Sequence, residues 1–247
     1  MSGTPDLLLA AFHWLEYLGL LGGIGSFVIR RLGRIGPRIS WANPPMHLAF
    51  AAALTGGFCL LLFIPTWVGG VRVAAEALAL VLCLRGRMLV AVPAVFAAAI
   101  LPLASHAALL PLPAGAEFAD ALHVLSAGMW AGGILALASL RPPGGWGSAE
   151  ARDLVERFGR VALIAFGITA LTGVLRATEQ LTAMTDLWST PYGVVLSLKS
   201  LGVLVMLVLS AVAWRRGTPL AGVEAGFAVV VVGATALLAA FPFTGIR

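Results

Sequence analysis

The chain has 247 residues, of which 60% are hydrophobic and only 11% are charged, and its mean hydropathy is +0.98. Such values lie outside the range of water-soluble domains and indicate a protein of the lipid bilayer. The net charge of +5 and the pI of about 10.2 require no nucleic-acid partner, because the arginines are spread over short loops. We therefore expect membrane lipid to surround the chain, and no nucleic acid to bind it.

Apolar stretches long enough to cross the membrane recur along the whole sequence. A transmembrane helix needs about 20 apolar residues to span roughly 30 Å of hydrocarbon. We predict eight spans, at residues 7–29, 46–68, 71–84, 88–110, 118–140, 161–178, 192–214 and 223–243. The third is the shortest of them. Continuous rather than alternating hydrophobicity favours helices over strands. The expected fold is an all-α, polytopic membrane bundle that forms a single transmembrane domain over residues 1–247.

The loop arginines predict the orientation of these spans. Arginines follow the first, third, fifth and seventh spans, so they all fall on one side of the membrane: Arg30, Arg31, Arg34, Arg38, Arg85, Arg87, Arg141, Arg152, Arg157, Arg160, Arg215 and Arg216. The positive-inside rule makes that side cytoplasmic and places both termini on the periplasmic side of a bacterial inner membrane. The N-terminal segment has no Lys or Arg before its apolar run, so we expect a retained first helix rather than a cleaved signal.

Three of the four histidines are expected at one depth. At 1.5 Å per helical residue, His13, His106 and His123 lie about 9, 6 and 8 Å below the outer surface. His106 and His123 flank a proline-rich bend, which brings them to the same end of adjacent helices. His47 lies at the opposite boundary, where an interfacial imidazole needs no special explanation.

Carboxylates and a lysine are expected in the same layer, namely Glu16, Glu76, Asp120 and Lys199. Ionisable groups in a bilayer are costly, so they normally face the bundle interior, pair with one another and mark a site. A lone intramembrane histidine is often only a hydrogen-bonded core residue, but three at one depth beside carboxylates favour a metal site.

Neutral imidazole binds copper, zinc and haem iron, and a carboxylate can accept its other ring N–H. We therefore predict metal ligation by His13, His106 and His123. Glu16, Glu76 and Asp120 are expected to support these imidazoles or to substitute for them.

Two further features bear on the chemistry. Lys199 is expected to pair with Glu76 or Asp120, because an unscreened ammonium would repel a bound cation. Met129 and Cys59 offer a soft-ligand path for Cu(I), although methionine more often fills space in a core.

The sequence lacks HExxH, GxSxG, Walker and GxGxxG motifs, so the enzyme classes that need them are not supported.

Three ordered segments resemble a known family. They are ALHVLSAGMWAGGILAL (121–137), RFGRVALIAFGITALTGVLRA (157–177) and LWSTPYGVVLSLKSLGVLVMLVLSAVAWRR (187–216), and they resemble the membrane domain of the copper resistance D (CopD) family. SHAA (105–108) and FHWLEYLGLLGG (12–23) are similar to the family's upstream pieces. The CopD-like core is expected at about 118–245. His106 and His123 match the family's histidine positions, His13 matches less securely, and Lys199 matches the lysine after TPYG.

The resemblance implies an inner-membrane protein that handles periplasmic copper, as Cu(I) or Cu(II), and passes it inward without being an enzyme. It also implies a periplasmic copper-binding partner. Two alternatives stay open at this stage. The histidines could hold haem b in an electron-transfer protein or a haem-pathway oxidase, or they could hold copper in an assembly factor that does not move it.

Overall fold

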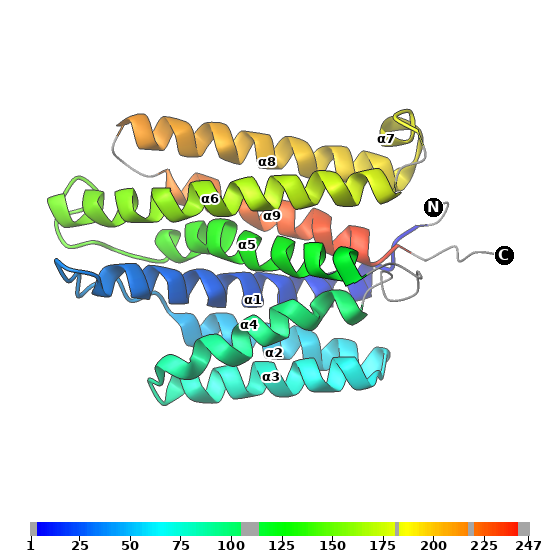
Figure 1. Ribbon diagram of the computed structural model, residues 1–247, viewed down its shortest axis with the longest axis horizontal. Coiled ribbons are helices and arrows are strands. Elements are labelled where there is room, and N and C mark those ends of the chain that lie inside the picture. The colour runs from blue at the N-terminus through cyan, green and yellow to red at the C-terminus, as the bar shows by residue number, and fades with distance from the viewer. Residues whose placement is uncertain (1–3, 105–113, 181–182, 217–219, 242–247) are drawn as a thin grey trace.

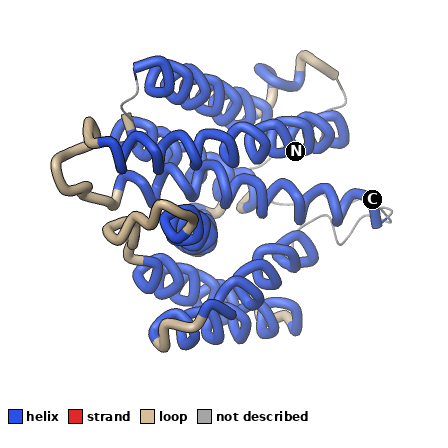
Figure 2. The backbone as a smooth tube through the Cα atoms, turned by 60° about the vertical axis from the view of Figure 1, so that its left-hand side comes forward, coloured by secondary structure: helices blue, strands red, loops and turns tan. Residues whose placement is uncertain are grey.

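The computed structural model describes residues 4–104, 114–180, 183–216 and 220–241, and all regular structure within these ranges is helical. The elements are α1 (Leu7–Arg34), α2 (Met46–Phe63), α3 (Trp67–Leu84), η1 (Met88–Val90), α4 (Ala91–Ile100), η2 (Leu101–Ala104), α5 (Ala114–Ala138), α6 (Ala149–Gln180), α7 (Asp186–Ser189), α8 (Pro191–Arg216) and α9 (Ala221–Ala239). The long helices run alongside one another, with the loops at their two ends (Figures 1 and 2). The prediction of an all-α bundle is confirmed.

Seven helices among the described residues are long and apolar enough to cross a membrane: α1, α2, α3, α5, α6, α8 and α9. The predicted fourth span appears as a shorter apolar helical segment, Met88–Leu103, formed by η1, α4 and η2. Pro93 and Pro102 lie in this segment and lack the N–H that a regular α-helix needs, in keeping with its 3₁₀ turns. Residues 105–110, which were expected to complete this span, lie outside the described residues.

Several helices are longer than expected, and α1 continues to Arg34, five residues beyond its predicted end. The third span begins at Trp67 instead of residue 71, because the Thr66 hydroxyl caps it by accepting a hydrogen bond from the Gly69 N–H at 3.0 Å. α6 begins at Ala149, twelve residues before the predicted span. Arg152, Arg157 and Arg160 therefore lie on the first turns of α6 and not in a loop.

Helix α1 lies in the middle of the bundle. In Figure 1, α2, α3 and α4 lie on one side of it, and α5, α9, α6 and α8 lie on the other. The most extensive helix contacts in the described structure are those of α1 with α2 and with α5. Side chains near the start of α1 can therefore face two different groups of helices.

Glycines allow these close contacts. A Cβ atom on Gly132 of α5 would lie 1.9 Å from the Leu21 carbonyl oxygen of α1, and one on Gly25 would lie 1.9 Å from the Gly132 carbonyl carbon. On the opposite face of α1, a Cβ atom on Gly19 would lie 2.2 Å from the Ala53 nitrogen of α2. Gly19 and Gly132 belong to the patterns Gly19-x-x-x-Gly23 and Gly128-x-x-x-Gly132, a spacing that is typical of close packing between membrane helices.

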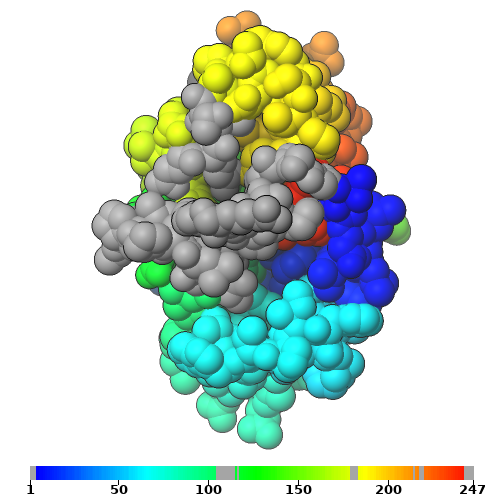
Figure 3. All heavy atoms as spheres, turned by 90° about the vertical axis from the view of Figure 1, so that its right-hand side faces the viewer, coloured from blue at the N-terminus to red at the C-terminus, as the bar shows by residue number. Residues whose placement is uncertain are grey.

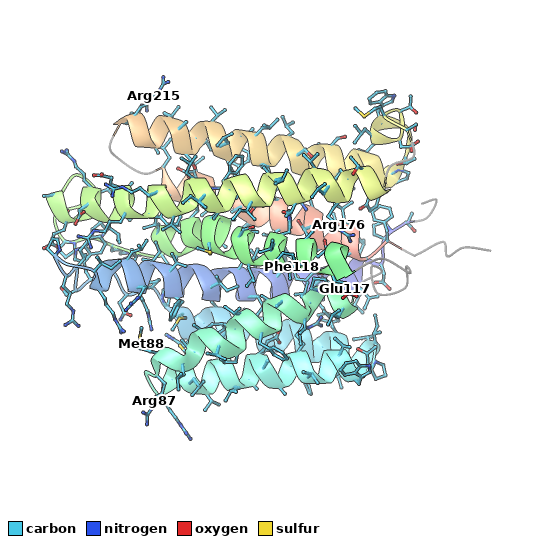
Figure 4. All side chains as sticks on the ribbon, viewed as in Figure 1. Arg87, Met88, Glu117, Phe118, Arg176 and Arg215 are labelled. Atoms are coloured by element: carbon cyan, nitrogen blue, oxygen red, sulfur yellow. The ribbon has the colours of Figure 1, made fainter. Side chains whose placement is uncertain are left out.

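The two ends of the bundle differ in charge. Arg87 and Arg215 project from one end, whereas Glu117 and Arg176 lie toward the other (Figure 4). At the Arg87 end, the Arg157 guanidinium donates hydrogen bonds to the carbonyls of Leu32 and Ile35 at 3.0 and 2.6 Å, which ties the last turn of α1 to α6.

At the opposite end, the Asp6 N–H donates to the Ala240 carbonyl at 3.1 Å, so α1 begins beside the end of α9. Figure 3 looks onto this second end, where the start of α1 (blue) lies between the α2–α3 turn (cyan) and the region of α7 and α8 (yellow).

Replacement of Gly132 by alanine should separate α1 from α5, because the added methyl group would overlap the Leu21 carbonyl. We expect Gly132→Ala to destabilise the protein by about 1–3 kcal/mol, the usual cost of overpacking. The measurement is thermal unfolding in detergent or nanodiscs. Gly167→Ala on α6 is the matched control, since nothing lies within 4 Å of its added Cβ. Equal unfolding temperatures for the two variants would contradict this packing.

Candidate functional site

Four polar side chains meet between α1 and α3, and we call them the α1–α3 cluster: His13, Glu16, Arg72 and Glu76. Glu16 and Glu76 have no exposed surface, and Arg72 is 5% exposed. His13 and Glu16 are three residues apart, so they lie on the same face of α1. Arg72 and Glu76 are four residues apart and share a face of α3 in the same way.

Short distances join the members of this cluster. Arg72 Nε lies 2.6 Å from Glu16 Oε1, and His13 Nδ1 lies 3.9 Å from Glu16 Oε2. Gly57 of α2 makes room for both carboxylates, because a Cβ atom there would lie 2.5 Å from Glu76 Oε2 and 2.9 Å from Glu16 Oε1. Two carboxylate groups and one guanidinium are thus packed against a glycine inside the bundle.

The two carboxyl groups of this cluster interact with each other and with Arg72. Glu16 forms an ion pair with the Arg72 guanidinium and shares a side-chain hydrogen bond with Glu76. A hydrogen bond between two carboxyl groups needs a proton on one of them. Ionisable side chains buried together inside a membrane bundle are typical of a functional site.

A second group of polar side chains lies between α5, α6 and α8, and we call it the α5–α6–α8 cluster: Asp120, His123, Thr172, Arg176 and Lys199. Arg176 Nε lies 2.6 Å from Asp120 Oδ1. His123 Nδ1 and the Thr172 hydroxyl are hydrogen-bonded at 3.0 Å. The positive charges that act on His123 come from Lys199 and Arg176.

The register of α1 against α5 relates the two clusters. Gly25 packs against Gly132, and Ile24 packs against Gly128, so these two helices run in parallel. Continued toward the start of both helices, this register brings His13 close to the level of Asp120 and His123. The two clusters therefore lie at similar depth, one facing α3 and the other facing α6 and α8.

The described residues give only part of the predicted histidine site. His106 lies outside the described residues, so its position relative to His13 and His123 stays a prediction. Within the described ranges, no group of three His, Cys, Asp or Glu side chains is arranged to hold a metal ion. His13 lies with Glu16 in the α1–α3 cluster, whereas His123 and Asp120 belong to the α5–α6–α8 cluster.

The two expected partners of Lys199, Glu76 and Asp120, lie in different clusters. Glu76 lies in the other cluster beside Glu16, and Asp120 acts on Lys199 electrostatically while its ion pair is with Arg176. Arg72, which is buried, and Arg176, which is partly buried, were missed as site residues, because the sequence placed them near span ends on the arginine-poor side. The sequence feature that could have indicated Arg72 is its spacing, four residues before Glu76, which places the two side chains on one helix face.

The two residues of the predicted soft-ligand path lie on different helices. Met129 of α5 packs against the large apolar core of α1, α5 and α6, and Cys59 is a half-buried free thiol on α2. Their role in a copper path stays a prediction.

An all-helical membrane protein with ionisable side chains buried toward one end of its bundle is the class that this fold and these clusters define. Residues 152–238, which include most of α6 and all of α7 and α8, match the family model described as copper resistance protein D. The resemblance seen in the sequence is confirmed over this segment. The matched segment is shorter than the expected core of 118–245, whose wider limits stay a prediction.

A second comparison also finds a protein that is named for copper. The chain is 36% identical over 110 residues to the copper transport protein CutJ of Bacillus subtilis (strain 168). This alignment covers 43% of the chain and 20% of the relative, so the chain spans about a fifth of that protein's length. No solved structure matches the chain.

Loss of the Thr172 hydroxyl should loosen the α5–α6–α8 cluster, because His123 Nδ1 would lose the partner it has at 3.0 Å. We expect Thr172→Val to cost about 0.6–1.5 kcal/mol of stability. Thermal unfolding in nanodiscs measures it. The control is Thr178→Val, which removes an exposed hydroxyl on the same helix that bonds only the Leu175 carbonyl. An equal loss in both variants would show that the contact with His123 contributes nothing.

Proposed function

We propose that this chain carries copper across the bacterial inner membrane, from the periplasmic face toward the cytoplasm, as a transporter and not an enzyme. The observation that carries the proposal is the match of residues 152–238 to the copper resistance protein D family, joined to the 36% identity with a copper transport protein. The buried ionisable clusters support it, because a cation needs polar groups to lower the cost of crossing hydrocarbon.

The copper ligands that we propose are the imidazoles of His13, His106 and His123. Imidazole nitrogen suits copper in either oxidation state. His123 has only Nε2 left for a metal while Thr172 holds Nδ1. Glu16, Glu76 and Asp120 supply negative charge beside these imidazoles. Copper is therefore a cargo in this proposal, held at the start of α1 and α5 before it moves on.

The orientation that we propose follows from the two ends of the bundle. The end that bears Arg87 and Arg215 faces the cytoplasm, where positive residues are retained. The α1–α3 and α5–α6–α8 clusters then lie toward the periplasm, and both termini are on that side. A periplasmic copper-binding protein is the donor that fits this arrangement.

Copper uptake into sealed vesicles that contain the full chain tests the proposal. We expect His13→Ala and His123→Ala each to lower uptake by about tenfold or more, because each removes a ligand from the cargo's first binding site. His47→Ala, on α2 at the opposite boundary, is the matched control and should transport as the wild type does.

Two results would overturn this function. A protein that binds copper but never moves it into the vesicles would be a copper-holding factor. A purified protein with a strong Soret band and bound iron would be a haem protein. Metal analysis and an absorption spectrum on the same preparation separate these outcomes.

A further inference from the structure

A pocket lined by four arginines lies at the end of the bundle opposite the two polar clusters. We call it the arginine pocket, after Arg30, Arg31 and Arg34 of α1 and Arg87, which lies between α3 and η1. The labels of Arg87 and Met88 mark its position in Figure 4, where α3 turns into α4. Its volume of about 70 Å³ is several times the space that one water molecule needs, so it has room for a small polar group.

The four guanidinium groups of the arginine pocket have no carboxylate partner. No Asp or Glu lines the pocket, and the ion pairs among the described residues all involve other basic side chains. On α6, by contrast, Arg157 pairs with Asp153 and Arg160 pairs with Glu156. The positive charge of the pocket is therefore not balanced by the part of the chain that the structure describes.

Arg30 holds a buried donor without an acceptor. Its Nη2 donates a hydrogen bond to the Pro44 carbonyl at 2.8 Å, whereas its Nε is buried and has no partner among the described residues. Buried N–H groups are normally hydrogen-bonded. Arg34 donates to the sulfur of Met88, which is a weak acceptor. A stronger acceptor in the pocket would satisfy both guanidinium groups.

The spacing of the arginines on α1 gathers like charges on one side of the helix. Arg30 and Arg34 are four residues apart, and Arg31 and Arg34 are three apart, so these side chains are neighbours on the helix surface. Like charges at this spacing repel each other. An anion between them removes the repulsion, and a guanidinium matches a phosphate group with two parallel N–H donors.

We propose that the arginine pocket binds the phosphate of an anionic phospholipid. The phosphate oxygens accept hydrogen bonds from the Arg30 guanidinium, and Arg31, Arg34 and Arg87 supply the opposite charge. In the orientation proposed above, this lipid belongs to the cytoplasmic leaflet. The inference goes beyond the proposed function, because it concerns a ligand other than copper at the far end of the bundle.

The surroundings of the pocket favour a lipid over a free phosphate ion. Arg30 directly follows the predicted first span, so the pocket lies where the hydrocarbon ends and lipid phosphates begin. Phe27 and Val90 give the pocket an apolar part. Leu84 and Leu89, on the two sides of Arg87 in the chain, are exposed and can contact acyl chains. A free ion in water would make no use of these apolar side chains.

Lipid titration of the full chain in a neutral detergent tests the inference. The probes are phosphatidylglycerol, which is anionic, and phosphatidylcholine, which has the same phosphate group but no net charge. The rise in unfolding temperature gives the apparent affinity for each lipid. We expect phosphatidylglycerol to bind the wild type about tenfold or more tightly than phosphatidylcholine.

The variant Arg30→Gln with Arg34→Gln should lower the affinity for phosphatidylglycerol by about tenfold or more, because two of the four cations are lost. The matched control is Arg215→Gln with Arg216→Gln. It removes the same charge from two exposed arginines at the end of α8, outside the pocket, and should bind the lipid as the wild type does.

A second variant covers the case in which the loss of Arg30 prevents folding. Arg31→Gln with Arg87→Gln changes two exposed side chains that line the pocket, so the fold should persist. We again expect weaker binding of phosphatidylglycerol, and added salt should reduce the difference between this variant and the wild type.

Three results would overturn the inference. Equal affinity of the wild type for the two lipids would show that the anionic headgroup is not recognised. An equal loss of affinity in the Arg215 and Arg216 control would assign the effect to overall charge and not to the pocket. Inorganic phosphate that stabilises the wild type without lipid, and displaces phosphatidylglycerol, would identify a free ion as the ligand. Copper is absent from all of these measurements, so their outcome is independent of the transport function.

Discussion

The close approach of α1 to its neighbours is the constraint on which the rest of the structure depends. Gly19 brings the backbone of α1 against α2, and Gly25 brings it against Gly132 of α5. Contacts this short leave no space for side chains between the helices, so rotation of α1 by even one residue would cause overlap. This packing turns Glu16 toward α3 and sets His13 at the level of His123.

The interior of a bilayer holds no water, so solvent does not screen the charges that are buried there. On the surface of a soluble protein, water and salt would screen charges such as those of Glu16 and Arg72, and their interaction energy would be small. Inside the bundle each charge must be balanced by another charge or by hydrogen bonds. The ion pairs of Arg72 with Glu16 and of Arg176 with Asp120 meet this requirement in the two clusters.

Sequence reasoning was strongest where periodicity and composition decide the outcome. Apolar runs located the seven long helices. It was weaker at helix ends, since the Thr66 cap and the extension of α6 to Ala149 depend on local hydrogen bonds that hydropathy does not report. Arg72 was missed because depth along a helix does not reveal the direction in which a side chain points.

The sequence by itself determined that this is a helical membrane protein with a segment similar to the CopD family, because hydropathy and ordered motifs are properties of the chain. It also indicated that ionisable residues gather toward one end of the bundle. Only the tertiary structure decided that these residues divide into two clusters, with Arg72 paired to Glu16 in one and Arg176 paired to Asp120 in the other. That division depends on the faces that α1 and α5 present to their neighbours, and helix packing sets those faces.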